Sequence, residues 1–158
     1  MVHPVREQYE RTIKQRRRDT FMEIVKKNFQ EGDLHIICTH LSTETSTASA
    51  KRRIQNFTRA VLFGMRSEGY STEKAAWVSL TEIRYGKDST TLKRAEQIRH
   101  HVLMRGVPQA MWPELEYLWH SGSCIAEPIR GSIDTLAAQL ANEGMGVYIK
   151  SKGIEGGD

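Results

Sequence analysis

The predicted architecture depends on the sequence IRHHVLM at residues 98–104. Its density of apolar and β-forming residues, closed by an Arg-Gly pair, predicts a strand. Successive side chains of a strand point to opposite faces, so Arg99 and His101 share one face while His100 lies on the other. A histidine on one strand and a carboxylate on its neighbour form half of a divalent metal site. Glu82, at the end of another strand-like run, supplies that carboxylate if the two strands are adjacent.

Strand-like and helical patterns continue through the rest of the chain. Runs rich in β-formers predict strands, and apolar residues that recur every three or four positions predict helices. The predicted strands are residues 34–39, 75–83, 98–104 and 123–129, with a short run at 147–150. The predicted helices are residues 5–29, 50–66, 112–119 and 133–141, and residues 86–96 form a polar hairpin connection. We therefore predict an α+β fold, with a central antiparallel sheet of about four to five strands flanked by helices.

Length and composition are those of one domain with its own core, since the chain has 158 residues and is 39% hydrophobic. We expect a single domain over residues 1–158, with a basic N-terminal helix in 1–32, a core in 33–150 and a flexible tail in 151–158. The only two cysteines, Cys38 and Cys124, are expected to be free thiols. No charged-then-apolar leader and no apolar run of membrane-spanning length occur, which predicts a cytoplasmic protein with no membrane partner.

Positive charge is concentrated in two segments of a chain whose formal net charge is +4. The segments are Arg16, Arg17 and Arg18 in the first predicted helix and Lys51, Arg52 and Arg53 in the second. Clustered Lys and Arg supply most of the non-specific affinity of proteins for nucleic acid, through counterion release. Solvated helix faces that bind nothing carry the same pattern, so both interpretations stay open.

Five short motifs occur in a fixed order along the chain. They are NFQEGDL at 28–34, RIQNF at 53–57, SLTE at 79–82, RHHVLMRG at 99–106 and LW at 118–119. In this order they resemble the rolling-circle replication initiators (Rep proteins) of bacterial plasmids and phages, which belong to the HUH (His-hydrophobic-His) endonuclease class. The resemblance covers residues 9–152 and implies a single Rep-like domain, a small antiparallel sheet flanked by helices.

The resemblance also implies a site. Proteins of this class hold one divalent metal ion with a His-x-His pair and an acidic residue on a neighbouring strand, and a tyrosine from a later helix attacks a DNA phosphodiester. The products are a 5′-phosphotyrosine link and a free 3′ hydroxyl. Carried over to this chain, Glu82 and His101 match metal ligands, and Tyr148, followed by Lys150 and Lys152, matches the nucleophile motif. The implied cofactor is Mg²⁺ or Mn²⁺.

Position 99 departs from the pattern, because Arg99 stands where the first metal histidine falls. A guanidinium stays protonated in proteins and cannot ligate a cation. His35 and His40 flank the first strand, and either can replace the lost ligand, with His40 the better placed. Arg99 can instead hold a phosphate directly, as a bidentate donor.

Two functions are compatible with these residues. The first is a nicking and joining replication initiator that acts on single-stranded DNA or an origin hairpin through Tyr148 and a divalent metal, with unwinding supplied by a host helicase. The alternative is a catalytically inactive Rep-like protein that binds nucleic acid through Arg99 and its basic faces and regulates or inhibits another nucleic-acid enzyme. An unrelated α+β domain is the third option.

Overall fold

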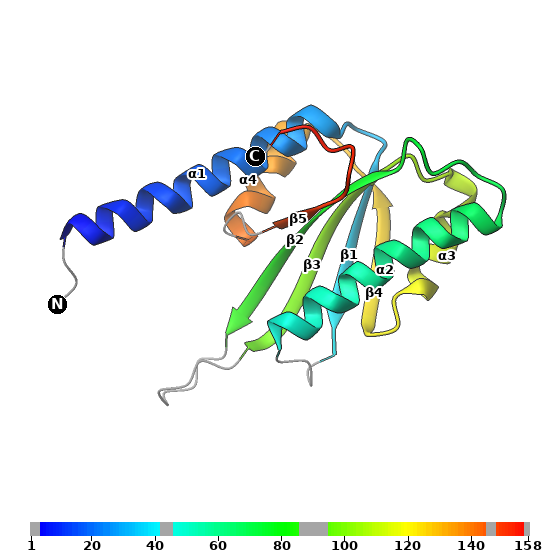
Figure 1. The fold of residues 1–158 in the computed structure, drawn as a ribbon, viewed down its shortest axis with the longest axis horizontal. Helices are drawn as coiled ribbons and strands as arrows, with labels where there is room; N and C mark the ends of the chain where they lie inside the picture. The colour runs from blue at the N-terminus through cyan, green and yellow to red at the C-terminus, as the bar shows by residue number, and fades with distance from the viewer. Residues whose placement is uncertain (1–3, 42–45, 86–94, 145–147, 157–158) are drawn as a thin grey trace.

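A five-stranded antiparallel sheet forms the centre of the computed structural model, which describes residues 4–41, 46–85, 95–144 and 148–156 (Figure 1). The strand order is β4-β1-β3-β2-β5. The strands are β1 (Leu34–His40), β2 (Ala76–Tyr85), β3 (Ala95–Arg105), β4 (Gly122–Pro128) and β5 (Tyr148–Lys150). The helices are α1 (Pro4–Asn28), α2 (Thr47–Ser67), α3 (Trp112–Leu118) and α4 (Ile133–Gly144), with a 3-10 turn at Gln109–Met111. The predicted α+β fold class is confirmed, and most of the predicted 86–96 connection lies outside the described residues.

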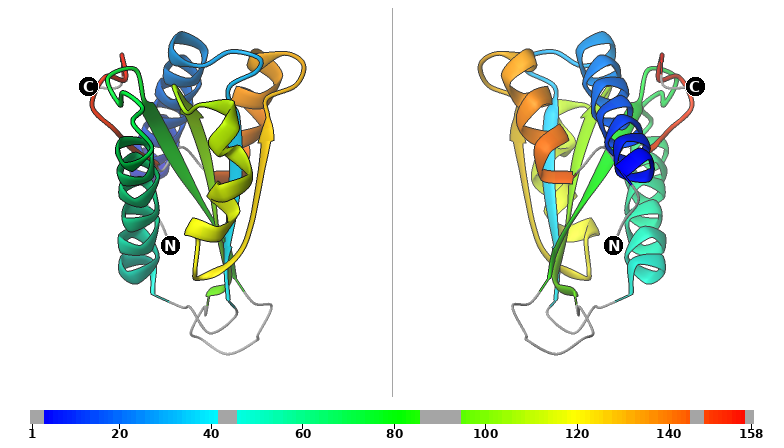
Figure 2. Two further views of the ribbon diagram at one scale, coloured as in Figure 1. Left: turned by 90° about the vertical axis from the view of Figure 1, so that its right-hand side faces the viewer. Right: turned by 90° about the vertical axis from the view of Figure 1, so that its left-hand side faces the viewer.

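Helices cover both faces of the sheet (Figure 2). The alternation of side chains along each strand divides the core into two clusters. On the α1/α4 face, residues of α1 and α4 pack against Val78, Leu80 and Leu103. On the α2/α3 face, residues of α2 and α3 pack against Ile36 and Val102, among others. The central strand β3 is therefore buried on both sides, and its alternate residues face different helical layers.

The helix α1 is anchored over only part of its length. Its buried residues are Phe21, Ile24, Val25 and Asn28, all toward its C-terminal end. The preceding turns project beyond the sheet (Figure 1). Ion pairs one turn apart run along its exposed surface, such as Arg6–Glu10 at 3.3 Å and Lys27–Glu23 at 2.6 Å. Such pairs support a solvated helix by a few tenths of a kcal/mol each, and no helix in the described part of the chain is long and apolar enough to cross a membrane.

The C-terminal segment is attached to the domain as far as residue 156, which differs from the expected flexible tail. The Asn28 side chain donates to the Glu155 carbonyl oxygen at 2.8 Å and accepts from the Glu155 amide at 2.9 Å. The Arg105 guanidinium donates to the Gly153 carbonyl oxygen at 3.1 Å. These contacts use backbone groups of a polar, Gly-rich stretch, so the composition that predicts a loose tail carries no sign of them.

The cysteines are free, as expected. Cys38 on β1 and Cys124 on β4 are directly opposite in the strand register, with their sulfur atoms 3.9 Å apart. Cys38 is fully buried on the α2/α3 face.

Gly122 begins β4 at a point where a side chain has no room, and we expect Gly122→Ala to destabilise the fold. Its φ is +153°, and a Cβ atom there would collide with the Thr39 carbonyl oxygen of β1. Strain and overpacking together are expected to lower the free energy of unfolding by about 2–4 kcal/mol, measured by urea titration. The control is Gly131→Ala, where φ is +78° but nothing lies within 4 Å of the added carbon. Equal losses in the two variants would contradict the collision.

Candidate metal centre

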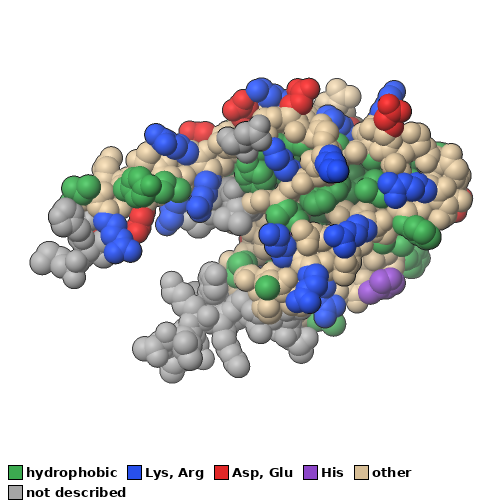
Figure 3. Space-filling model, viewed as in Figure 1, with side chains coloured by type: hydrophobic (Ala, Val, Ile, Leu, Met, Phe, Trp, Pro, Cys, Tyr) green, Lys and Arg blue, Asp and Glu red, His purple; other side chains and the backbone are tan. Residues whose placement is uncertain are grey.

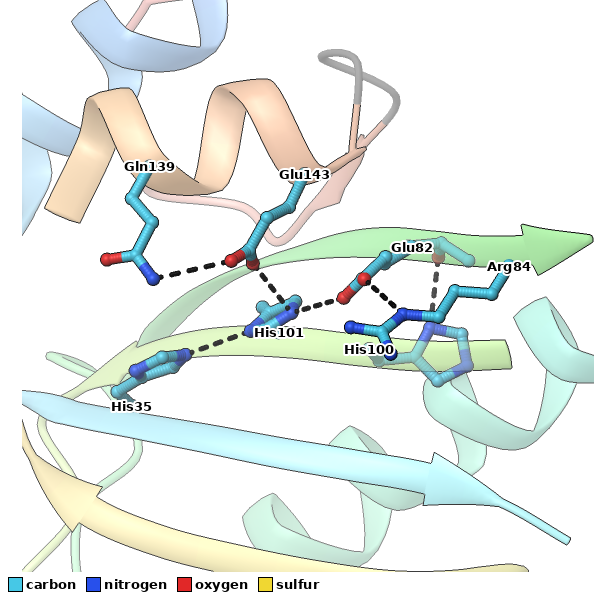
Figure 4. A network of polar contacts seen from close by, with 8 residues as sticks. His35, Glu82, Arg84, His100, His101, Gln139 and Glu143 are labelled. Atoms are coloured by element: carbon cyan, nitrogen blue, oxygen red, sulfur yellow. Dashed lines mark hydrogen bonds and ion pairs between the residues drawn. The ribbon is translucent and has the colours of Figure 1, made fainter. Parts of the chain in front are cut away.

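Three possible ligand atoms converge on the α1/α4 face, from β2, β3 and α4 (Figure 4). The His101 Nε2 atom lies 3.1 Å from the Glu82 Oε2 atom and 3.2 Å from the Glu143 Oε2 atom. All three atoms lie within 4.8 Å of one another. Glu82 and His101 are buried, whereas Glu143 is exposed, so the cluster reaches solvent on the α4 side.

Strand register and helix packing together produce this convergence. In the β2–β3 pair, Leu80 lies opposite His101 and Glu82 lies opposite Arg99. Glu82 and His101 are thus diagonal neighbours on one sheet face, within reach of long side chains. The helix α4 packs on the same face through Leu140 and Ala141. Glu143 comes three positions after Leu140 and therefore shares its side of the helix, directed at the sheet.

The donor set fits a divalent cation. One imidazole nitrogen faces two carboxylate oxygens, and a single N–H group cannot make two full hydrogen bonds, so two converging negative charges are left only partly compensated. A cation between the three atoms removes that repulsion. Two carboxylates with one imidazole form a mainly oxygen set, which suits Mg²⁺ or Mn²⁺.

Surrounding groups orient these side chains. His35 on β1 places its Nε2 atom 3.2 Å from the His101 Nδ1 atom. Burial, and then the proximity of His101, lower the pKa of His35 to about 4, so His35 is neutral at pH 7 and can accept a hydrogen bond from Nδ1–H of His101. Without a cation, Nε2–H of His101 donates to Glu82; with a cation bound, donation from Nδ1–H to His35 would leave the Nε2 lone pair free to ligate it. Gln139 Nε2 donates to Glu143 Oε1 at 3.3 Å and fixes that carboxylate.

Two arginines accompany Glu82. Arg84 Nε donates to Glu82 Oε1 at 3.1 Å. Burial raises the pKa of the Glu82 carboxyl, but hydrogen bonds from His101 and Arg84 and the charge of Arg99 outweigh it, so the pKa lies below its usual value. Arg99 is half-buried on the same face, and its Nε atom has no hydrogen-bond partner among the described residues. The charge of Arg99 thus acts on the centre, and its Nε atom is buried and unpaired among the described residues.

His40 does not join this centre, and the preference for His40 over His35 is wrong. In β1, Ile37 is the residue opposite His101, so odd-numbered residues share its face. His40 lies on the α2/α3 face, where its Nε2 atom is 2.7 Å from His100 Nε2. His35 has the correct parity and contacts His101 directly.

Tyr148 shares the sheet face of Glu82 and His101. It begins the edge strand β5 opposite Leu80, which in turn lies opposite His101 on the next strand. The strands are spaced at ~4.8 Å, so about 10 Å separates the Cα atoms of Tyr148 and His101. The Tyr148 ring is half-buried and packs against Phe21 of α1, with ring centroids 5.6 Å apart. The resemblance implies a tyrosine on a helix, and in this respect the structure differs from it.

The remaining predicted site residues lie on several surfaces. Lys150 donates from Nζ to the Gly156 carbonyl oxygen at 2.6 Å, and Lys152 is exposed. In α1, Arg16 and Arg17 are exposed and Arg18 is half-buried. In α2, Lys51, Arg52 and Arg53 are exposed, and Arg53 donates to Ser121 Oγ at 3.0 Å. The α2 residues are on the opposite side of the sheet from the candidate metal centre.

Glu143 is the functional candidate that the sequence patterns do not reveal. They predict a final helix that ends at residue 141, which leaves Glu143 in the connection after it. The signal that could have found it is the spacing of three from the core residue Leu140, which places a carboxylate on the buried side of any longer helix.

We expect the protein to lose stability in acid because His100, on the α2/α3 face, is buried as a neutral group. Burial, and then neighbouring His40, lower the pKa of His100 to about 3. Because this folded-state pKa lies below the ordinary value of 6.5, the unfolded chain binds more protons between these values, and stability falls as the pH drops below 6.5. From pH 7.5 to pH 5.0 we expect His100 to cost about 2 kcal/mol, and His35 to add a loss of the same sign.

Urea unfolding in EDTA at the two pH values measures this effect. His100→Gln is expected to remove about half of the pH dependence, whereas His120→Gln, at an exposed position, leaves it unchanged. A wild-type protein equally stable at both pH values would contradict the assignment of His100 as a buried neutral group.

The resemblance to rolling-circle initiators remains a prediction that rests on the order of short motifs. Its fold expectation, an antiparallel sheet with flanking helices, agrees with the structure. Its metal-site expectation stays a prediction, and the possible ligand atoms that converge among the described residues differ from the expected set, because Glu143 and not a second histidine joins Glu82 and His101. Comparisons of the chain with models of protein families, with curated protein sequences and with solved structures each find no match.

Proposed function

We propose that this protein is a divalent-metal-dependent enzyme that nicks and rejoins DNA through Tyr148. The observation that carries the proposal is the convergence of Glu82, His101 and Glu143 on the sheet face that also bears Tyr148. Two of these ligands and the tyrosine are indicated by the motif order, and the third comes from a separate helix.

In this proposal Glu143 takes the place of the metal histidine that Arg99 replaces. With a third ligand supplied by α4, the centre has no need of a histidine at position 99. Arg84 and Arg99 then offset the two carboxylates, and a bound divalent ion makes the centre net positive. A positive, partly buried centre next to a tyrosine attracts the negatively charged phosphodiester of DNA, and Arg99 is a bidentate donor suited to its oxygens.

The reaction assigned to the centre is a transesterification. A divalent metal held by Glu82, His101 and Glu143 would polarise the scissile phosphate. The Tyr148 oxygen forms a bond to phosphorus, the bond from phosphorus to the 3′ oxygen breaks, and the proton lost by the phenol is balanced by one gained at the 3′ oxygen. The 5′ phosphate stays on the tyrosine, so attack by a 3′ hydroxyl reverses the step and rejoins the strand. The backbones of Tyr148 and His101 are about 10 Å apart, with Leu80 of β2 between them on the same sheet face.

A second candidate function is binding of nucleic acid without cleavage. The observation that favours it is that Arg84 already occupies one oxygen of Glu82 while Arg99 adds positive charge beside it. In that case the arginines take the phosphate directly, and the protein regulates or inhibits another nucleic-acid enzyme.

The test is a search for a covalent adduct. The full chain is incubated with fluorescent single-stranded DNA of mixed sequence and with supercoiled plasmid, in Mn²⁺, in Mg²⁺ or in EDTA. We expect a species that survives denaturing electrophoresis, carries the label attached to the 3′ side of the cut, and forms only with metal. Salt-sensitive binding with no adduct on a library of random single strands and hairpins would overturn nicking and leave the second candidate.

A further inference from the structure

One face of α2 carries a regular pattern of exposed residues that the metal centre does not use. We call it the α2 ridge, and its residues are Arg52, Asn56, Arg59, Phe63 and Arg66. Their spacing alternates between four and three positions, so they form one stripe along the helix. All five are exposed, and the Phe63 side chain is 70% exposed.

The charge of α2 has one sign. The helix holds five basic residues, Lys51, Arg52, Arg53, Arg59 and Arg66, and its sequence contains no Asp or Glu. Arg52, Arg59 and Arg66 form no ion pair with any residue in the described ranges. In α1, by contrast, acidic residues one turn away neutralise several of the bases. The uncompensated positive charge of the ridge favours a negatively charged ligand.

We propose that the α2 ridge binds a single strand of nucleic acid, with phosphates on the three arginines and a base stacked on Phe63. Successive ridge arginines are seven residues, or about 10 Å, apart, which suits a ligand that carries charge along its length. Stacking of a base on an exposed aromatic ring needs an unpaired base, and it tolerates any sequence.

Phe63 favours an unpaired nucleic-acid strand over a protein partner or a duplex as the ligand of the ridge. Its neighbours on the ridge are Arg59 and Arg66, so it forms no apolar patch of the kind that holds a protein partner. A duplex presents its backbone and groove edges to such a surface and offers an aromatic ring no free base face. An unpaired nucleic-acid strand offers phosphates to the arginines and a base face to the Phe63 ring.

The ridge is separate from the proposed nicking centre. It lies on the helical layer at one side of the sheet, and α4 with Glu143 lies on the other (Figure 2). Viewed from the α2 side, the charged side chains over this helix are basic (Figure 3). The inference therefore does not rest on the proposed function, and binding measured in EDTA tests the ridge without cleavage.

The experiment is fluorescence anisotropy of the full chain with a labelled oligo(dT) strand, a matched abasic strand and a matched duplex, in EDTA over a range of salt. We expect Arg52→Gln/Arg66→Gln to weaken single-strand affinity roughly 10-fold and to reduce the slope of log K against log salt by about 1.4. We expect Phe63→Ala to weaken oligo(dT) binding roughly 10-fold with no change in slope, and to have no effect on the abasic strand.

Matched variants control for charge and folding. Lys26→Gln/Arg130→Gln removes the same charge from exposed positions off the ridge and is expected to keep at least half of the affinity. Phe63→Trp is expected to restore or strengthen stacking. Equal loss in the control pair, or an unchanged affinity of Phe63→Ala for oligo(dT), would overturn the assignment. So would sedimentation showing that Phe63→Ala abolishes a salt-resistant self-association of the wild type, since the ridge would then bind protein.

Discussion

Tyr148→Phe is expected to abolish the covalent protein–DNA adduct while binding of the strand stays within about two-fold of the wild type. The phenol oxygen is the attacking atom, and phenylalanine removes only that atom from the ring that packs on Phe21. An unactivated phenol has a pKa near 10, so no other tyrosine outside the centre can substitute at neutral pH. The loss of nicking rate is expected to exceed about 10³-fold, measured by single-turnover electrophoresis.

Tyr117→Phe is the control for this experiment. Tyr117 is 79% exposed on α3, on the other side of the sheet from the metal centre, so its loss should leave the adduct unchanged. Peptide mapping of the wild-type adduct should identify Tyr148 as the modified residue. An adduct that persists in Tyr148→Phe and maps elsewhere would remove the tyrosine from the mechanism and leave the metal centre as a separate question.

Alanine at Glu82, His101 or Glu143 is expected to eliminate both nicking and the thermal stabilisation given by Mn²⁺. A ligand at 100 times its dissociation constant stabilises a protein by about 2.7 kcal/mol, which for a chain of this size raises the melting temperature by about 5–10 °C. Loss of one of three ligands is expected to weaken the metal by more than about 100-fold, beyond the effect of outer-shell residues. Differential scanning calorimetry with and without Mn²⁺ measures the difference directly.

The direction of the stability change that Glu143→Gln causes in EDTA distinguishes a metal ligand from a residue that only stabilises the fold. Glu143→Gln keeps the shape of the side chain and removes one of two facing negative charges, so the metal-free protein should be equally or more stable than the wild type while the Mn²⁺ response is lost. Glu127→Gln, at an exposed position on β4, should keep the response. A Glu143→Gln variant that melts lower in EDTA yet still responds fully to Mn²⁺ would exclude Glu143 from the centre.

The fold was predictable from the sequence because its strands and helices have distinct periodicities. The run at 98–104 has apolar residues on both faces, which identifies it as the central strand. The order of strands and helices indicates the α+β class. The adjacency of β2 and β3, on which the pairing of Glu82 with His101 depends, is expected from a hairpin connection. These are local or nearly local features.

The errors at the site come from non-local geometry. β1 and β3 pair only after α2 and β2 have intervened, so no turn fixes their register, and a shift of one residue exchanges His35 for His40. Glu143 reaches the centre only because α4 packs on the sheet through Leu140 and Ala141. No local sequence pattern predicts which residues of β1 share a sheet face with His101, or where α4 packs on the sheet.

The residues after β5 have a structural role that their composition hides. β5 is three residues long, and contacts of residues 151–156 hold it in place. The Ser151 amide donates to the Trp77 carbonyl oxygen, and the Trp77 amide donates to Ser151 Oγ. The Glu155 amide donates to the side chain of Asn28 at the end of α1. Truncation of the chain after residue 150 would therefore remove the contacts that hold β5, the strand that carries Tyr148. The proposed nucleophile owes its position to the contacts of residues 151–156.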